Sequence, residues 1–522
     1  MEIDKRYIWG GLVVLVAATF FFLVARPSFS GYLLFGDEGY YASRGEWINE
    51  NMEIPRYFDV YPRDALARIL FTDNPLPIFL TAFLFFAGES AVRLMNPLIS
   101  VLNGLLAFVA AGRFYSKEAG VFSMVLFFAM PSVITYTILL YADALVALLM
   151  GSAVYIFSRY LDTSRRKYLY VAAVLAGFAA LTKVTGFFTP AIFILMLLAR
   201  QKPPKDLARD IINIAAIFAV LTIPWFGIHN FLVAGNPGQV PGVNVFGPFP
   251  DKEYLGPQPA PSVTDFKGAV GGGGTGEAFL SFGLLNFVDF AYGVWTFIFI
   301  LVGFAFAFMR KEKHDTSLLF WAVPVALIIL WQAKSGRSED LARFMIPVAV
   351  PFAVAGGLAA ERIYDHLKHT GSSYRLASHA LMVAILVISF ISVSEKAESL
   401  VETKEWGGAD FKAACDWVAA NTPADASLLS IWEGNTEYPC KRGVLWSQLN
   451  DVGDIVFAVN ETAVETMRLH GIDYVVIQKF SVTLQPQWPN YPVSFIKFLD
   501  DSPQWFEKVF ENNAAMVYKV KY

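Results

Sequence analysis

The chain has 522 residues, of which 55% are hydrophobic and only 16% are charged. Soluble globular proteins carry roughly 25% charged residues, so this sequence has too little polar surface to be soluble along its whole length and indicates a membrane protein. A net charge of −4 excludes the basic surface of a nucleic-acid-binding protein, and two cysteines are too few for a disulfide scaffold or a cysteine-based metal cluster.

The first predicted element is an apolar segment, residues 8–25, which is long enough to cross a bilayer and follows Lys5 and Arg6. It lacks a small-residue cleavage site, so we expect a retained helix with a cytoplasmic N-terminus. Residues 26–74 are rich in Tyr, Trp, Arg and Asp, which predicts a first external loop with helices on the membrane surface. The apolar run 75–87 is too short to cross and is placed at the outer interface or in a re-entrant position.

Clusters of Lys and Arg divide the rest of the membrane part into hairpins. Because such clusters in short loops mark the cytoplasmic side, each pair of apolar runs between two clusters is predicted to go out and return. With the first helix, the scheme gives about eleven spans, with the N-terminus inside and the C-terminus outside. The further predicted spans are 91–112, 120–138, 141–158, 168–182, 186–199, 210–232, 281–308, 316–333, 343–360 and 376–393.

Two further external regions are predicted. Residues 233–280 form a Pro/Gly-rich loop or lid, and residues 394–522 form a small soluble α/β domain after the transmembrane part, 1–393. Cys415 and Cys440 both lie in this domain and would pair in an oxidising compartment, while a buried free thiol is the alternative. Helical patterns at 410–420 and 454–470 alternate there with strands at 427–432 and 474–478 and a terminal hairpin at 506–520.

Acidic residues at the external ends of the spans are functional candidates, because a charge in a membrane-buried position costs on the order of 3 kcal/mol. Asp37 and Glu38 follow the first span directly, and two adjacent carboxylates exceed what a helix N-cap requires. Asp37 is therefore a candidate general base for an acceptor hydroxyl, with capping as the alternative. Asp143 lies at a predicted outer turn and has the same two interpretations.

Basic residues on the same side could bind an anionic headgroup. Lys183 is the only charged residue in the two predicted spans around it, and it is drawn to the outer leaflet, where a lipid phosphate would lie. Snorkelling to the interface is the alternative. Arg343 begins a span at the outer surface, where it could contact a phosphate or anchor the helix end. With Arg93 and the nearby Arg337, these residues predict a cationic site for a phosphate.

The candidate residues lie in short segments, and the order and spacing of these segments along the chain are informative. The segments are Asp37-Glu38, Asn74-Pro75-Leu76-Pro77, Gly88-Glu89-Ser90 with Arg93, Ala111-Gly112-Arg113-Phe114-Tyr115, Asp143-Ala144-Leu145, Leu181-Thr182-Lys183 followed by Pro190, and Arg343-Phe344 with Pro347 and Pro351. Together they resemble, over residues 8–360, the membrane glycosyltransferases of the GT-C fold that use polyprenyl-phosphate sugars. The nearest branch contains dolichyl-phosphate-mannose protein mannosyltransferases and lipid A aminoarabinose transferases. The separated prolines and Phe344, where the family usually has Tyr, indicate the superfamily rather than a subfamily.

The resemblance implies an inverting transfer on the extracytoplasmic face. Asp37 would deprotonate an acceptor hydroxyl that displaces polyprenyl phosphate, with Glu38 beside it and Asp143 supporting the acceptor. Lys183 and Arg343 would hold the donor phosphate. Members of this branch generally need no metal, but oligosaccharyltransferases of the same fold bind one, so Asp37 and Asp143 are alternative ligands for a divalent metal. The acceptor could be a protein, a lipid or a glycan.

Two other classes of protein fit the sequence less well. A transporter of a lipid-linked or anionic substrate would carry its coupling charges near the midplane of broken helices, whereas the predicted charges lie at one surface. A sensor or scaffold would not need about eleven spans as an anchor. The sequence therefore predicts an integral membrane glycosyltransferase whose partners are a lipid-linked donor, an acceptor and membrane lipids.

Overall fold

The computed structural model describes two compact units. Unit 1 comprises Met1–Phe29, Arg93–Ile223 and Thr275–Leu400, and unit 2 comprises Ser30–Val92, Pro224–Gly274 and Val401–Tyr522. Within them, the residues that the structure describes are 5–29, 37–52, 75–201, 203–229, 291–333, 343, 345–370, 372–405, 408–430, 433–446, 460–479 and 493–522.

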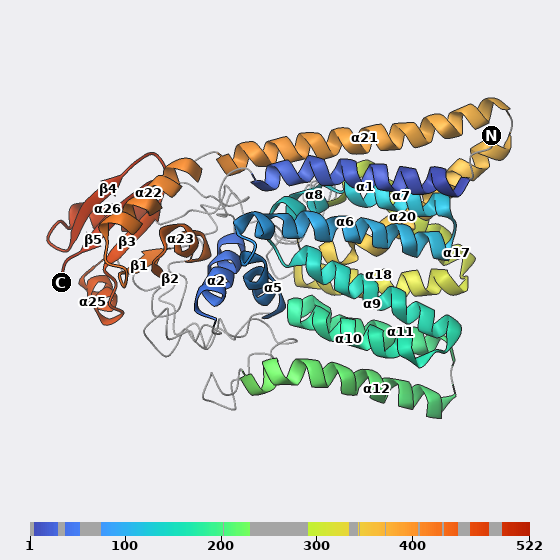
Figure 1. Ribbon diagram of the computed structural model, residues 1–522, viewed down its shortest axis with the longest axis horizontal. Helices are drawn as coiled ribbons and strands as arrows, with labels where there is room; N and C mark the ends of the chain where they lie inside the picture. Colours follow the sequence, from blue (N-terminus) through green and yellow to red (C-terminus); the bar gives the residue numbers. More distant parts are fainter. Residues whose placement is uncertain are drawn as a thin grey trace. The chain divides into compact units, whose positions relative to one another are not determined.

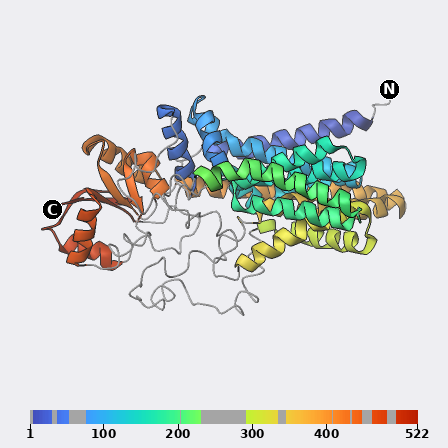
Figure 2. The ribbon, with the colours of Figure 1, turned by 90° about the horizontal axis from the view of Figure 1, so that it is seen from below.

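Unit 1 is built from long apolar helices, of which α9, α10 and α12 lie side by side (Figure 1, Figure 2). Two helices at its borders, α6 and α21, continue into unit 2. The helices are α1 (Lys5–Phe29), α6 (Glu89–Phe114), α7 (Lys117–Ala129), α8 (Pro131–Ile138), α9 (Asp143–Thr163), α10 (Arg166–Thr182), the 3₁₀ helix η1 (Val184–Phe188), α11 (Thr189–Ala199), α12 (Pro204–Thr222), α17 (Val294–Arg310), α18 (Lys313–Ala333), α20 (Ile346–Thr370) and α21 (Ser372–Glu405).

Five of the described helices are long and apolar enough to cross a membrane, or six if the bent pair α7 and α8 is one span. The count of about eleven therefore stays a prediction, although helices follow most of the predicted segments. The five spans are Gly10–Phe29, Glu89–Phe114, Asp143–Thr163, Pro204–Phe226 and Ile346–His369. Shorter apolar helices are Val184–Ala199, Val294–Arg310 and Pro75–Phe85, the last of which agrees with the short run predicted at 75–87.

The segment predicted as one span at 120–138 is broken in the structure. Helix α7 ends at Ala129, Met130 is extended, and α8 starts at Pro131 with a bend of 64°. Proline causes the break, because it has no N–H to donate and disfavours helical geometry at the preceding residue.

Small residues allow the helices of unit 1 to approach closely. A Cβ atom at Gly303 in α17 would overlap the carbonyl of Ala355 in α20, and one at Gly357 in α20 would overlap Ser123 in α7. Glycine at these crossings lets the backbones touch, which is the usual packing of helices within a membrane.

Unit 2 contains α2 (Asp37–Asn51), α5 (Pro75–Phe85), most of the π-helix η2 (Ile223–His229) and a C-terminal α/β domain. The domain has a five-stranded sheet of order β2-β1-β3-β5-β4, in which β1 runs parallel to β2 and β3 while β5 is antiparallel to β3 and β4. Its strands are β1 (Ser427–Ser430), β2 (Gly443–Trp446), β3 (Tyr474–Gln478), β4 (Phe506–Glu511) and β5 (Ala515–Val520). Its helices are α22 (Gly408–Asn421), α23 (Glu433–Cys440), α25 (Glu461–Leu469) and α26 (Val493–Asp501).

The predicted α/β character of the C-terminal region is confirmed. The strand predicted at 474–478 is β3, all of whose residues are buried, and the predicted terminal hairpin is β4 and β5. The helix predicted at 454–470 is described only from Glu461, because residues 447–459 lie outside the described residues. The domain boundary predicted at residue 393 falls inside the continuous helix α21 and stays a prediction.

Candidate functional site

Three of the predicted site residues meet in unit 1. Asp143, at the start of α9, is fully buried, and its two carboxylate oxygens accept hydrogen bonds from two different cations. Lys183 Nζ donates to Oδ1, and Arg343 Nε donates to Oδ2 at 2.9 Å. The Lys183 and Arg343 side chains are only 9% and 15% exposed. We call this arrangement the ionic triad.

The capping interpretation of Asp143 is wrong. The N-cap of α9 is Ala142, which makes no side-chain capping bond, and both oxygens of Asp143 are directed to the cations. A carboxylate that bridges two cations is a stronger electrostatic arrangement than a cap, because each hydrogen bond joins two opposite charges.

A break between two helices presents Lys183. Helix α10 ends at Thr182, Lys183 is extended with φ −163°, and η1 begins at Val184. A Cβ atom at Gly186 would overlap the backbone of Ala179, so only glycine permits this return of the chain. Lys183 is only 7% exposed and forms an ion pair with Asp143. It therefore does not snorkel to the membrane interface.

An aromatic ring orients Arg343. The carbon of its guanidinium group lies 4.3 Å from the centroid of the Tyr141 ring, which itself packs edge-on against Tyr136. A planar guanidinium stacks on an aromatic face more readily than an ammonium, so this contact favours arginine at position 343.

A polar face on α6, absent from the sequence-based candidates, holds the segment that leads into Asp143. Asn96 Nδ2 donates to the carbonyls of Tyr136, Leu139 and Tyr141, and Asn103 Nδ2 donates to that of Ala144 at 2.9 Å. Ser100, between the two asparagines, accepts a hydrogen bond from Thr137 at 2.7 Å. The sequence signal for this polar face is the spacing of Asn96, Ser100 and Asn103, which are four and three residues apart and so lie on one side of an apolar helix.

Of the other predicted residues, one makes a contact elsewhere in unit 1, two belong to unit 2 and one lies outside the described residues. Arg93 on α6 donates to the carbonyl of Ser28 in α1 at 3.1 Å. Asp37 is the first residue of α2, where Glu38 is buried, and both belong to unit 2. Arg337 lies outside the described residues.

The alternative that Asp37 and Asp143 bind a metal stays a prediction, because the side chain of Asp37 lies outside what the structure describes. Among the residues that the structure describes, no group of three or more His, Cys, Asp and Glu side chains could hold a metal ion. Asp143 in particular faces two cations, which would repel a divalent metal at the same oxygens.

Known proteins share parts of this sequence and its architecture. Residues 75–227, which include Asp143 and Lys183, match the family described as dolichyl-phosphate-mannose-protein mannosyltransferase. No curated protein sequence matches the chain.

Among solved structures, the oligosaccharyltransferase of Archaeoglobus fulgidus in the apo form is similar with a TM-score of 0.64 and 17% identity, covering 91% of this chain and 70% of that chain. ArnT from Cupriavidus metallidurans bound to undecaprenyl phosphate is similar with a TM-score of 0.64 and 16% identity, and the match covers 99% of this chain and 98% of that chain. The mycobacterial arabinofuranosyltransferase AftD is similar with a TM-score of 0.53 and 14% identity, and the match covers 100% of this chain and 40% of that chain.

The shared architecture confirms the predicted fold class. The chain is a helical membrane protein with the GT-C fold of membrane glycosyltransferases and a small C-terminal sheet. The family match and the fold together support a glycosyltransferase that uses a polyprenyl-phosphate-linked donor, and they do not favour the transporter alternative.

Proposed function

We propose that this protein transfers a sugar from a polyprenyl-phosphate donor to an acceptor hydroxyl on the extracytoplasmic face of the membrane, with inversion at the anomeric carbon. The ionic triad carries the proposal. It brings two cations to one carboxylate in a buried position on a GT-C fold. A phosphate can accept hydrogen bonds from both cations.

Lys183 and Arg343 would hold the donor phosphate, one as a compact charge and the other as a planar fork. As the bond from the sugar to the phosphate oxygen breaks, negative charge grows on that oxygen, and fixed cations stabilise it without reorganising. Asp143 would keep the two cations together, since they would otherwise repel each other. This role differs from the support of the acceptor that the resemblance implies.

Asp37 would be the general base. The acceptor oxygen forms a bond to the anomeric carbon, the bond from that carbon to the phosphate oxygen breaks, and the hydroxyl proton passes to the Asp37 carboxylate. Polyprenyl phosphate leaves from the opposite face of the sugar, which inverts the configuration. Glu38, the next residue of α2, would support Asp37 from its buried position.

The reaction we propose requires no divalent metal. The side chains of Lys183 and Arg343 would supply the positive charge that a metal provides elsewhere, and they already engage Asp143, one of the two alternative metal ligands.

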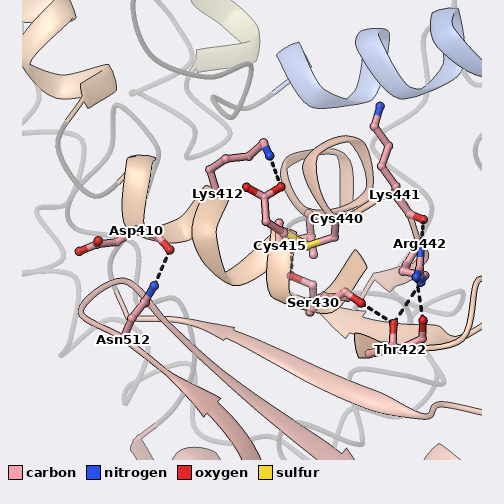
Figure 3. The surroundings of a disulfide bond; sticks show 12 residues. Asp410, Lys412, Cys415, Thr422, Ser430, Cys440, Lys441, Arg442 and Asn512 are labelled. Carbon is pink, nitrogen blue, oxygen red and sulfur yellow. Dashed lines mark hydrogen bonds and ion pairs between the residues drawn. A yellow bond between two sulfur atoms is a disulfide. The ribbon is translucent and has the colours of Figure 1, made fainter. Parts of the chain in front are cut away.

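The C-terminal domain, in this proposal, faces the extracytoplasmic side. Cys415 in α22 and Cys440 in α23 form a disulfide bond (Figure 3), which decides the open question of their pairing. Disulfides persist in oxidising compartments, so the bond supports an external domain together with the predicted cytoplasmic N-terminus.

A transfer assay tests the proposal. The purified protein in lipid vesicles is incubated, with a metal chelator present, with polyprenyl phosphates that carry different radiolabelled sugars and with protein, lipid and glycan acceptors. We expect one label to move to an acceptor while polyprenyl phosphate is released. Passage of the intact lipid-linked sugar across the bilayer without transfer would instead indicate a transporter.

A further inference from the structure

Helix α23 is bound to the C-terminal domain at its middle and at its last residue. The disulfide joins that last residue, Cys440, to Cys415 in α22, and Thr436, in the middle of the helix, shares a hydrogen bond of 2.7 Å with Ser430 at the end of β1. Just beyond the helix, Arg442 donates to two carbonyls at the end of α22, those of Ala419 and Thr422 (Figure 3). A helix of eight residues with an internal proline would not be stable alone, so these bonds set its position.

The same helix contacts α2, which also belongs to unit 2. Glu437 Oε2 accepts hydrogen bonds from Arg44 Nη1 and, at 3.1 Å, from Ser43 Oγ. The side chains of Arg44 and Glu437 are 9% and 10% exposed, so the ion pair is nearly dry. One residue past the helix, Lys441 pairs with Glu46 at the surface.

Helix α5 supports the other side of α2. A Cβ atom at Gly45 would lie 2.6 Å from the Thr81 side chain, which shows how closely the two helices approach. Asn49 Nδ2 donates to the carbonyl of Ala82 at 3.3 Å. Both faces of α2 are therefore engaged within unit 2, and Gly45 lies next to the Arg44 that Glu437 binds.

A buried ion pair of this kind is a means of fixing geometry rather than a large source of stability. The cost of removing two charges from water offsets most of their attraction, but breaking the pair leaves a buried charge without compensation. An α-helix is rigid over two turns. A contact that fixes Arg44 therefore also fixes the position of Asp37, which lies about 10 Å away along the helix axis.

We propose that α23 is a positioning element of the reaction and that Glu437 is its positioning residue. By binding Arg44 and Ser43, Glu437 holds α2 so that Asp37, at the start of that helix, meets the acceptor hydroxyl. The inference rests on the proposed role of Asp37. In this inference the C-terminal domain contributes to catalysis, and the disulfide holds α23 in place for that role.

Glu437→Gln tests the inference through two measurements on the full-length protein. The first is transfer kinetics, where we expect kcat to fall about 10- to 100-fold, the effect of a small misplacement of a reacting group. The KM for the lipid-linked donor should not change, because the donor phosphate is held by Lys183 and Arg343 in unit 1. The second is hydrogen–deuterium exchange, where we expect faster exchange in α2.

Two further variants define the effect. Ser43→Ala, which removes one hydrogen bond to Glu437 and leaves the ion pair, should lower kcat less than Glu437→Gln, and it serves as the test if Glu437→Gln does not fold. Glu511→Gln breaks the more exposed pair between Lys479 and Glu511 in the same domain and should change neither kcat nor exchange in α2.

The outcomes separate this inference from the proposed function. Unchanged kcat in both Glu437→Gln and Ser43→Ala, in a wild-type protein that transfers sugar, would overturn the inference alone. An equal loss of kcat in Glu511→Gln would also overturn it, because the effect would then be a general one. Absence of transfer by the wild type with every donor would instead overturn the proposed function.

Discussion

In the proposed function, the two cations of the ionic triad bind the donor phosphate. We expect Lys183→Ala and Arg343→Ala each to weaken binding of a non-hydrolysable phosphonate analogue of the donor by about 10- to 100-fold, the worth of one charge-assisted hydrogen bond. Titration of the analogue measures this directly. Arg209→Ala is the control, because Arg209 forms an exposed pair with Asp206 in α12. Unchanged affinity in both triad variants would show that these cations have only a structural role.

Asp143 should behave differently from its two partners. Asp143→Asn removes the carboxylate that bridges Lys183 and Arg343 in a buried position, which should destabilise the ligand-free protein by about 3 to 5 kcal/mol. A bound phosphonate analogue should restore part of the loss by supplying the missing negative charge. Thermal unfolding with and without the analogue measures both effects. A variant with normal stability but slow transfer would instead place Asp143 against the acceptor.

The sequence predicts the members of the triad but not their contact. Each is a charge at the end of an apolar run, which makes it conspicuous. Their contact depends on the packing of α9 against α10 and α20 and on the close return of the chain at Gly186, neither of which has a local pattern.

At the scale of single elements, the polar face of α6 should control the break between α8 and α9. Asn96→Leu removes the amide group that donates to the carbonyls of Tyr136, Leu139 and Tyr141, so we expect a loss of about 1 to 3 kcal/mol in stability. Donor affinity should fall as well, because the loosened segment carries Tyr141 and Asp143. Leu98→Ala on the exposed side of α6 is the control. If Asn96→Leu unfolds at the wild-type temperature, the face has no such role.

Elements with a regular pattern are predictable and those with an irregular composition are not. Strand β3 is a run of β-branched residues, and its predicted bounds agree with the structure. Helix α23 contains Gly434 and Pro439, which disfavour a helix, and the disulfide and the hydrogen bond of Thr436 stabilise it. Pro131 marks the break between α7 and α8, but the mainly apolar composition of the segment favours one span.

For the whole molecule, the topology is a prediction with a direct test. If α5 does not cross the membrane and the C-terminal domain is external, cysteines at Gly88 and Asp425 should both react with a membrane-impermeant reagent added outside intact cells. Cys415 and Cys440 are disulfide-bonded and should give no background. A cysteine at Lys117 is the control for the predicted cytoplasmic side. Labelling at Gly88 only after the membrane is opened would mean that α5 crosses.

In the proposed reaction Asp37 takes the proton of the acceptor while a lipid phosphate leaves, and a single-turnover experiment on Asp37→Asn measures this step. The protein is first loaded with the labelled donor that the transfer assay identifies, and acceptor is then added. We expect donor binding like that of the wild type and transfer slower by about 10² to 10⁴, because the amide keeps the shape of the side chain but cannot accept the proton. Asp425→Asn, at an exposed position, should transfer at the wild-type rate. Transfer by Asp37→Asn at the wild-type rate would show that Asp37 is not the general base.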